Sequence, residues 1–266
     1  MKIAVCIRGE LRTWKSCYEN IFNTFPVDTD YFFTTWNQNH NPLTNKIEKV
    51  IEEDIVKTFS NRNLVDIEIV PFAYPANKII LPASYYMAYL WYKSSQLKRK
   101  HEIKNKFEYD CVIGIRPDVV YAEKFGMEII TMDDFTLYTD SGMSSNSVFY
   151  GICCSDIVIC GKSFLSDIVS DFYLYIKDIG TEDLNYIPDL SHNTLSDYLN
   201  KRKITISTKI MESLKNEYIL RFGVELENNL HLTDNDRYVL KELRDKWDRD
   251  SQREIMLDYQ NGDYSD

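Results

Sequence analysis

Short apolar runs alternate with amphipathic segments along most of this chain. Runs rich in β-branched and aromatic side chains predict strands, and apolar residues that return every three or four positions predict helices. The predicted strands cover residues 2–7, 30–35, 66–72, 110–115, 135–139, 156–161 and 204–207. The predicted helices cover residues 13–25, 46–59, 82–104, 164–176 and 194–200. This order predicts an α/β fold with a mixed, largely parallel sheet flanked by helices.

The pattern changes near residue 211. The segment 233–259 is highly charged, and four of its apolar residues suggest one face of a helix: Tyr238, Leu240, Leu243 and Trp247. A helix with such a face has to bury it against something. We therefore expect one domain over residues 1–210 and a helical C-terminal extension over residues 211–266. The extension is expected to pack on the domain or on a partner, and that partner could be a second copy of the chain, bound through this helix to form a homo-oligomer.

Net charge narrows the classes of partner. The 266 residues carry a formal net charge of −10, whereas a general nucleic-acid binder needs a basic surface. A basic run at residues 98–101 follows a helical pattern, and a solvated helix face is the simpler interpretation of it. We expect no transmembrane segment, because no apolar stretch reaches spanning length.

The cysteines indicate a reducing compartment. None of the six forms a CxxC pair. Cys6, Cys111 and Cys160 lie inside apolar runs and are expected to be buried as small hydrophobic side chains. The N-terminal segment also lacks the apolar length of a secretory signal. We expect a cytoplasmic protein, and peripheral attachment to a membrane stays open.

Several common catalytic motifs are missing. The chain has neither GxGxxG after its first strand nor GxxxxGK[ST], which disfavours dinucleotide enzymes and P-loop kinases. It has no GxSxG and no HExxH, which disfavours α/β-hydrolases and zincins. The histidines are scattered, so a polyhistidine metal site is not expected.

Polar residues follow the predicted strands where a ligand is expected. In α/β sheets, ligands bind outside the carboxyl ends of the strands. Arg8 and Gly9 follow the first strand, Trp36 follows the second, and Arg116-Pro117-Asp118 follows the fourth. These three strand ends are therefore the first candidates for a binding site.

The segment RPD, residues 116–118, has two interpretations that spacing alone weighs about equally. In one, Asp118 provides an oxygen ligand for Mg²⁺ or Mn²⁺, and Arg116 binds a diphosphate directly. In the other, the two side chains form an ion pair that closes the strand end. Pro117 fixes the local backbone in either case.

Four other residues are weaker candidates. Arg8 and Arg12 flank the turn after the first strand and could hold a phosphate or base, although an ordinary turn with solvated arginines is slightly favoured. Asp156 could be a general base or accept a hydrogen bond from a sugar hydroxyl, and His192 could be a base or a metal ligand. For both of these residues a structural role is favoured by position alone.

Several segments together resemble one family of enzymes. They are KIAVCIRGELRTWKSCYENI, DTDYFFTTWN, the stretch from ASYYMAYLWY to YDCVIGIRPDVVY, and the pair CSDIVICGKSFLSDI and HNTLSDYLNKRKI. In this order they resemble a glycosyltransferase family with a GT-A-like (Rossmann-like) fold, found in bacterial capsule or surface-glycan loci and in large DNA viruses. The resemblance covers roughly residues 1–206, and its third segment is the most specific.

The resemblance implies transfer of a hexose or pentose from a UDP-, GDP- or TDP-sugar donor to a glycan acceptor, in the host cytoplasm if the source is viral. RPD stands where the family has a metal-binding DxD motif, so Asp118 is the implied ligand of Mn²⁺ or Mg²⁺, with Arg116 replacing the first acid. The implied donor-binding residues are Arg8, Gly9, Arg12, Trp36, Arg116 and Asp118. Asp156 is the first candidate for the catalytic base and His192 the second. A nucleotidyltransferase and a non-catalytic binding protein of the same fold stay open.

Overall fold

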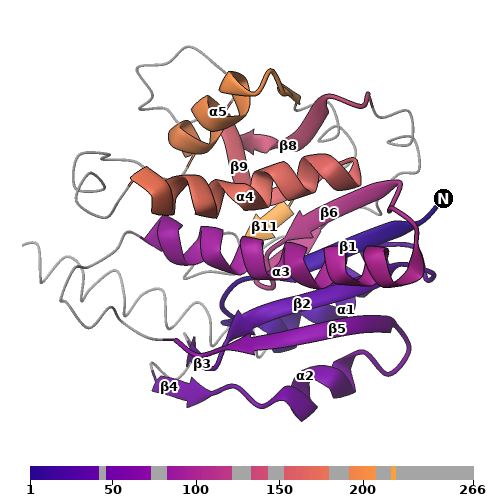
Figure 1. Ribbon diagram of the computed structural model, residues 1–266. Helices are drawn as coiled ribbons and strands as arrows, with labels where there is room; N and C mark the ends of the chain where they lie inside the picture. The colour runs from indigo at the N-terminus through magenta and orange to yellow at the C-terminus, as the bar shows by residue number, and fades with distance from the viewer. Residues whose placement is uncertain are drawn as a thin grey trace, which may run out of the picture.

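A computed structural model describes residues 1–41, 46–72, 83–121, 133–142, 153–179, 192–207 and 217–219. These residues form a seven-stranded sheet in the order β10-β8-β9-β6-β1-β2-β5, flanked by helices (Figure 1). The strands of this sheet are β1 (Ile3–Arg8), β2 (Asp30–Trp36), β5 (Asn63–Val70), β6 (Cys111–Ile115), β8 (Thr136–Gly142), β9 (Cys153–Gly161) and β10 (Thr205–Ser207). The helices are α1 (Trp14–Thr24), α2 (Glu52–Thr58), α3 (Ala83–Asn105), α4 (Ser163–Ile179) and α5 (His192–Lys201).

The central strands of the sheet are parallel. β1 pairs in parallel with β6 on one side and β2 on the other, and β2 pairs in parallel with β5. β9 runs antiparallel to both β6 and β8, and β10 is parallel to β8. The predicted α/β fold, with a mixed, largely parallel sheet flanked by helices, is therefore confirmed.

The sheet buries an apolar layer on each face. On one face Val5 and Ile7 of β1 pack with Trp14 and Ile21 of α1. On the other face Ala4 and Cys6 pack with Leu97 of α3, as the alternation of side chains along a strand requires. α3 and α4 lie side by side over this second face (Figure 1). Three cysteines predicted to be buried, Cys6, Cys111 and Cys160, are buried.

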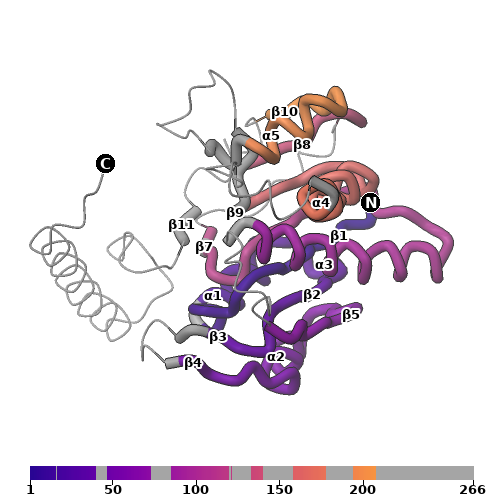
Figure 2. The backbone as a smooth tube through the Cα atoms, turned by 60° about the vertical axis from the view of Figure 1, so that its left-hand side comes forward, coloured from indigo at the N-terminus to yellow at the C-terminus, as the bar shows by residue number. Residues whose placement is uncertain are grey.

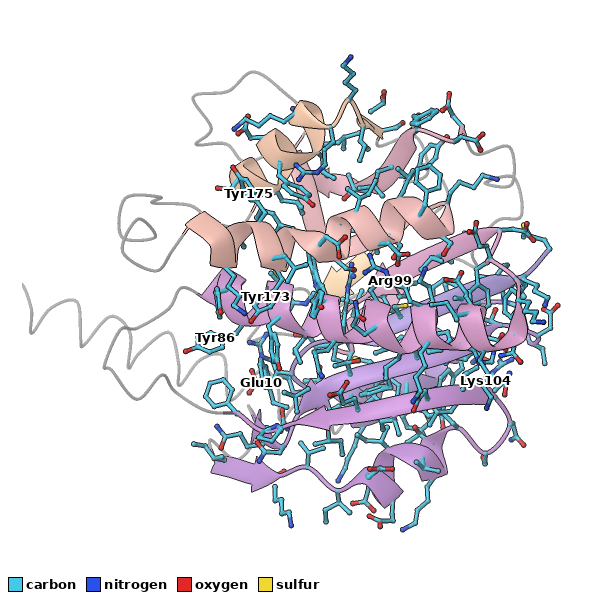
Figure 3. The ribbon with its side chains drawn as sticks, viewed as in Figure 1. Glu10, Tyr86, Arg99, Lys104, Tyr173 and Tyr175 are labelled. Carbon is cyan, nitrogen blue, oxygen red and sulfur yellow. The ribbon has the colours of Figure 1, made fainter. Side chains whose placement is uncertain are left out.

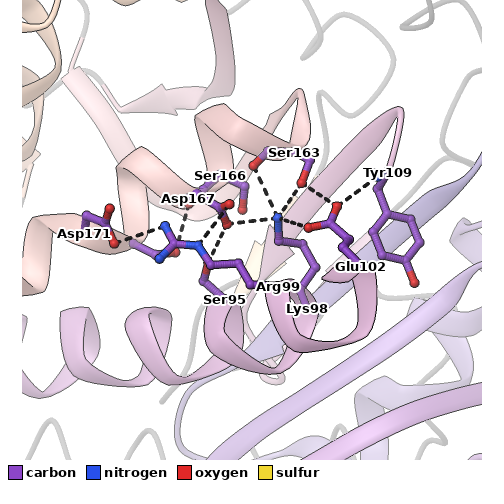
Figure 4. A network of polar contacts seen from close by, with 10 residues as sticks. Ser95, Lys98, Arg99, Glu102, Tyr109, Ser163, Ser166, Asp167 and Asp171 are labelled. Carbon is purple, nitrogen blue, oxygen red and sulfur yellow. Dashed lines mark hydrogen bonds and ion pairs between the residues drawn. The ribbon is translucent and has the colours of Figure 1, made fainter. Parts of the chain in front are cut away.

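A network of charged and polar groups joins α3 to α4 (Figure 4). The Lys98 side chain is fully buried, and its Nζ lies 2.9 Å from Glu102 Oε2 and 2.9 Å from Asp167 Oδ1. Nζ also donates to the hydroxyl of Ser163. Glu102 Oε1 accepts from that hydroxyl at 2.6 Å and from the Tyr109 backbone N–H at 2.9 Å.

This network corrects the interpretation of the basic run as a solvated face. Lys100 does lie at the surface, with 77% of its side chain exposed, but Lys98 points into the α3–α4 interface. The sequence signal for a solvated face was the density of charge. Acidic partners on α4 and one turn along α3 make burial of Lys98 possible, because a buried cation needs a carboxylate and further hydrogen-bond acceptors.

The helix predicted over residues 46–59 is wrong in its first part. Strand β4 (Lys46–Lys49) pairs antiparallel with β3 (Gln38–Asn41), and only α2 is helical. Two residues assigned to the buried helix face, Ile47 and Ile51, are 71% and 49% exposed. The ladder with β3 forms between segments that are near in the chain, and it overrides the helical spacing of the apolar residues.

Part of the segment beyond residue 211 returns to the domain. β11 (Glu217–Ile219) pairs antiparallel with β7 (Val119–Tyr121), which packs beside α1 (Figure 2). The charged segment 233–259 and its predicted helix lie outside the described residues. Within the described residues, no helix is long and apolar enough to cross a membrane.

Candidate functional site

The carboxyl ends of β1 and β6 meet at a reversal of the strand order. β1 leads through α1 to β2 on one side, whereas the chain returns through α3 to β6 on the other side. α1 and α3 pack on opposite faces of the sheet, so the connections diverge at this point. Such a reversal is where α/β sheets place their ligands. The two loops that leave it contain Arg8 to Arg12 and Arg116 to Asp118.

Two glycines allow these loops to pack closely. Gly9 has φ +145, and a Cβ built on it would lie 3.0 Å from Cδ of Pro117. A Cβ on Gly114 would overlap the guanidinium of Arg8. A side chain at Gly9 would push the β1 loop away from Pro117, and a side chain at Gly114 would displace the guanidinium of Arg8. Gly9 therefore holds the two loops together, and Gly114 leaves room for an arginine on the sheet.

Asp118 is bound by two arginines. Arg116 Nε donates to Oδ1 at 2.8 Å and its Nη2 to Oδ2 at 2.7 Å, in a bidentate pair. Arg12 Nη1 donates to Oδ2 at 3.2 Å. The Asp118 side chain is 1% exposed. The ion pair that the sequence left as one of two interpretations is therefore present, with a second arginine added from the β1 loop.

Arg12 is the more accessible of these arginines. Its side chain is 26% exposed, against 10% for Arg116, and its Nε also donates to Glu10 Oε2 at 3.1 Å. Its backbone has φ 38, and its N–H donates to Asn39 Oδ1 at 2.5 Å. A non-glycine residue in this conformation costs of order 1–3 kcal/mol and persists only where several contacts fix it. Contacts with Asn39, Glu10 and Asp118 fix it here.

Glu10 and Asn39 were missed by the sequence reasoning. Glu10 stands between two arginines in RGELR, and that local alternation of charge was a usable signal. Asn39 lies 27 residues from Arg12 along the chain, and nothing in the sequence indicates their contact.

Arg8 and Trp36 are located at the expected strand ends but are nearly buried. The Arg8 guanidinium lies 4.2 Å from the ring centroid of Trp91 on α3, and the residue is 3% exposed. Trp36 is 8% exposed and stacks on Tyr89 with ring centroids 6.0 Å apart. Both side chains fold back over the α3 face of the sheet.

The two candidates for the base are located by their backbone only. Asp156 comes two residues before Val158 in β9, and Val158 pairs with Ile115, the last residue of β6. Its backbone therefore lies near the edge of the sheet where RPD begins. His192 is the first residue of α5. The side chains of both residues lie outside the described part of the chain.

Cys17 lies beneath the site and does not provide a nucleophile. Its thiol is fully buried, with Sγ 3.6 Å from the Thr13 hydroxyl. Burial is the main cause that raises the pKa of Cys17 to about 12, and the charge of Asp118 raises it further. The thiolate form, which is the nucleophile, is therefore disfavoured at neutral pH.

The fit of a divalent cation to Asp118 can be judged from the groups around it. Both carboxylate oxygens already accept N–H groups from arginines. Among the described residues, no three His, Cys, Asp or Glu side chains gather as a metal site. These groups do not fit Mn²⁺ or Mg²⁺ as they stand, because the cation would have to displace Arg12 or Arg116.

Comparisons with known proteins give a likeness in structure and no match in sequence. No family model matches the chain, and no curated protein matches it. Among solved structures, the chain is similar to the apo-form glycosyltransferase GlyE of Streptococcus pneumoniae TIGR4, with 9% identity and a TM-score of 0.49. The match covers 94% of this chain and 63% of that one, so the chain spans less than two thirds of the structure it matches.

Proposed function

We propose that the protein is a glycosyltransferase that uses a nucleotide-diphosphate sugar as donor. The observation that carries the proposal is the convergence of Arg12 and Arg116 on Asp118 at the reversal of the strand order. The resemblance of the sequence segments to a GT-A-like family supports the same activity.

The charges at the strand ends suit a diphosphate. Arg12 and Arg116 place two guanidinium groups beside the carboxylates of Glu10 and Asp118, in a chain whose formal net charge is −10. Guanidinium groups bind phosphate oxygens through paired N–H donors.

In the proposed reaction, arginines stabilise the leaving group. The bond between the anomeric carbon of the sugar and the diphosphate oxygen breaks, and the oxygen of the acceptor hydroxyl forms a bond to the sugar. Negative charge develops on the departing nucleoside diphosphate. Arg12 turns from Asp118 and Glu10 toward this diphosphate, while Arg116 keeps Asp118 neutralised. We propose Asp156 or, second, His192 as the base that takes the proton of the acceptor hydroxyl.

The divalent cation stays a prediction and has no step in this scheme. If Mn²⁺ or Mg²⁺ takes part, it would have to bind at Asp118 after an arginine leaves, and it would supply further neutralisation of the diphosphate.

A screen of UDP-, GDP- and TDP-sugars tests the proposal. Binding is followed by thermal shift and donor hydrolysis by release of nucleoside diphosphate, each with Mn²⁺, with Mg²⁺ and with chelator. One donor class is expected to bind, and Arg12→Ala is expected to weaken its binding by roughly 10- to 100-fold, the worth of one hydrogen bond to a charged group. The matched control is Arg202→Ala, on a surface arginine that stacks on Tyr198 of α5.

The outcomes separate the alternatives. If no nucleotide sugar binds, the transferase proposal fails. Release of pyrophosphate from a nucleoside triphosphate and a sugar phosphate would identify a nucleotidyltransferase instead. Donor binding without hydrolysis or transfer to any glycan would indicate a non-catalytic binding protein. Hydrolysis that is insensitive to chelator would remove only the metal.

A further inference from the structure

Four tyrosines from two helices lie side by side near the start of α3. Tyr85, Tyr89 and Tyr92 are spaced i, i+4, i+7, which places them on one face of that helix. Tyr173 of α4 contacts all three, with ring centroids 5.4, 5.0 and 5.4 Å apart. All four residues are partly exposed. We call these four residues the tyrosine platform.

The platform contacts Trp36, one of the residues expected to bind the donor. Trp36, the last residue of β2, stacks on Tyr89 at an interplanar angle of 22°. Glu10, from the β1 loop, and Tyr173 lie toward the same end of the molecule in Figure 3. That is the end at which the parallel strands finish and α3 begins. A ligand on the platform would therefore extend toward Arg12.

The polar groups of the platform are neutral. The hydroxyls of Tyr85 and Tyr173 lie 3.3 Å apart and can donate or accept. Two nearby cations on α3 are paired with acids: Lys93 lies 2.5 Å from Glu68, and Arg99 lies 2.9 Å from Asp167. The surface thus offers flat aromatic faces and phenol hydroxyls, with the charge of both cations balanced.

The neutral, aromatic character of the platform indicates which class of ligand it binds. A polyanion would need cations free to meet it, and the chain as a whole has a net charge of −10. A neutral sugar ring has an apolar C–H face that packs on an aromatic ring, and hydroxyls at its rim that match phenol groups. Buried packing alone would not require tyrosine at each of four positions.

We infer that the tyrosine platform binds a neutral oligosaccharide and presents its end to the strand-end arginines. The role as acceptor surface rests on the proposed transferase activity. Binding of the oligosaccharide does not, because it needs neither donor nor turnover.

The test is titration of the full chain with neutral hexasaccharides of glucose, galactose, mannose, xylose and N-acetylglucosamine, read by saturation-transfer NMR and calorimetry. Tyr92→Ala is expected to weaken binding of whichever hexasaccharide binds by about tenfold, because one aromatic face for stacking is lost. Tyr175→Ala is the matched control: it is a tyrosine of the same helix as Tyr173, but it faces Tyr198 of α5. It is expected to bind as the unaltered protein does. Tyr92→Leu, which keeps apolar packing without a flat ring, replaces Tyr92→Ala if that variant does not fold.

Two results would overturn the inference. Either no hexasaccharide binds, or the unaltered protein and the Tyr92 variant (Tyr92→Ala or Tyr92→Leu) bind equally well. Donor hydrolysis is measured separately, without glycan, so that failure of the tyrosine platform can be distinguished from failure of the proposed transferase function. Hydrolysis with no glycan binding refutes the platform alone. Glycan binding that Tyr92→Ala weakens, without nucleotide-sugar binding, refutes the transferase alone.

Discussion

Replacement of Lys98 by methionine is expected to destabilise the protein strongly. The lysine is fully buried and lies 2.9 Å from carboxylate oxygens of both Glu102 and Asp167. Methionine fills much of the same space but removes the positive charge. Among the described residues, Glu102, itself 6% exposed, then keeps two neutral donors, the Ser163 hydroxyl and the Tyr109 N–H.

The contacts that Glu102 and Asp167 keep determine how much stability Lys98→Met loses. Loss of one partner from a buried ion pair costs about 3–5 kcal/mol. The cost should fall near the lower end, about 3 kcal/mol, because Asp167 keeps Arg99 and Ser95 as partners. In a chain of this size, that loss lowers the melting temperature by roughly 6–12 °C.

Chemical and thermal unfolding at neutral pH measure this loss. Lys100→Met is the control on the same helix, since Lys100 is 77% exposed and 3.9 Å from Asp66, and it should change stability by less than about 0.5 kcal/mol. The double variant Lys98→Met/Glu102→Gln should regain much of the loss, because no unpaired carboxylate stays at residue 102. A loss below about 1 kcal/mol in Lys98→Met, well short of the range for a buried pair, would refute the reasoning. So would a double variant that is no more stable than the single one.

Three further predictions concern the strand ends. Asp118→Asn should cost about 3–5 kcal/mol in urea unfolding, since Arg116 and Arg12 lose their carboxylate; an unchanged midpoint would contradict the buried pair. Gly9→Ala should cost about 1–3 kcal/mol in the same assay, because φ is +145 and Pro117 lies against the new Cβ; no loss would mean that the loop adapts freely. The raised pKa of Cys17, about 12, means that its contribution to stability is complete below pH 9 and falls as the unfolded thiol ionises. Between pH 8 and pH 10, the free energy of unfolding of the unaltered protein should therefore fall by about 1.4 kcal/mol more than that of Cys17→Ala. Curves of this free energy against pH that run parallel for the two proteins would contradict the prediction.

The sequence predicted most of the parallel half of the fold because local patterns determine it. The apolar run that became β1 and the helical spacing that became α1 are complete within their own segments. The β3–β4 hairpin was missed because Ile47 and Ile51 follow a helical spacing, yet both are exposed. Backbone pairing, which leaves no mark in the apolar pattern, determined the structure there.

The sequence predicted where in the fold the site lies better than it predicted the contacts between its side chains. The rule for strand ends led to Arg8, Arg116 and Asp118, and these three lie where parallel strands meet at a reversal of order. The contact of Arg12 with Asp118 joins residues 106 positions apart, and no spacing in the sequence encodes it. Burial of Lys98 was missed for the same reason, because its partner Asp167 belongs to another helix.

The most direct test of the central claim is the position of a bound nucleotide sugar in a crystal of the full chain. The crystal is soaked with the donor that gives the largest thermal shift. The diphosphate is predicted to lie outside the carboxyl ends of β1 and β6, with an oxygen about 3 Å from a guanidinium nitrogen of Arg12 and with Arg116 still on Asp118. A nucleotide sugar bound elsewhere, with Arg12 still on Asp118, would contradict the account.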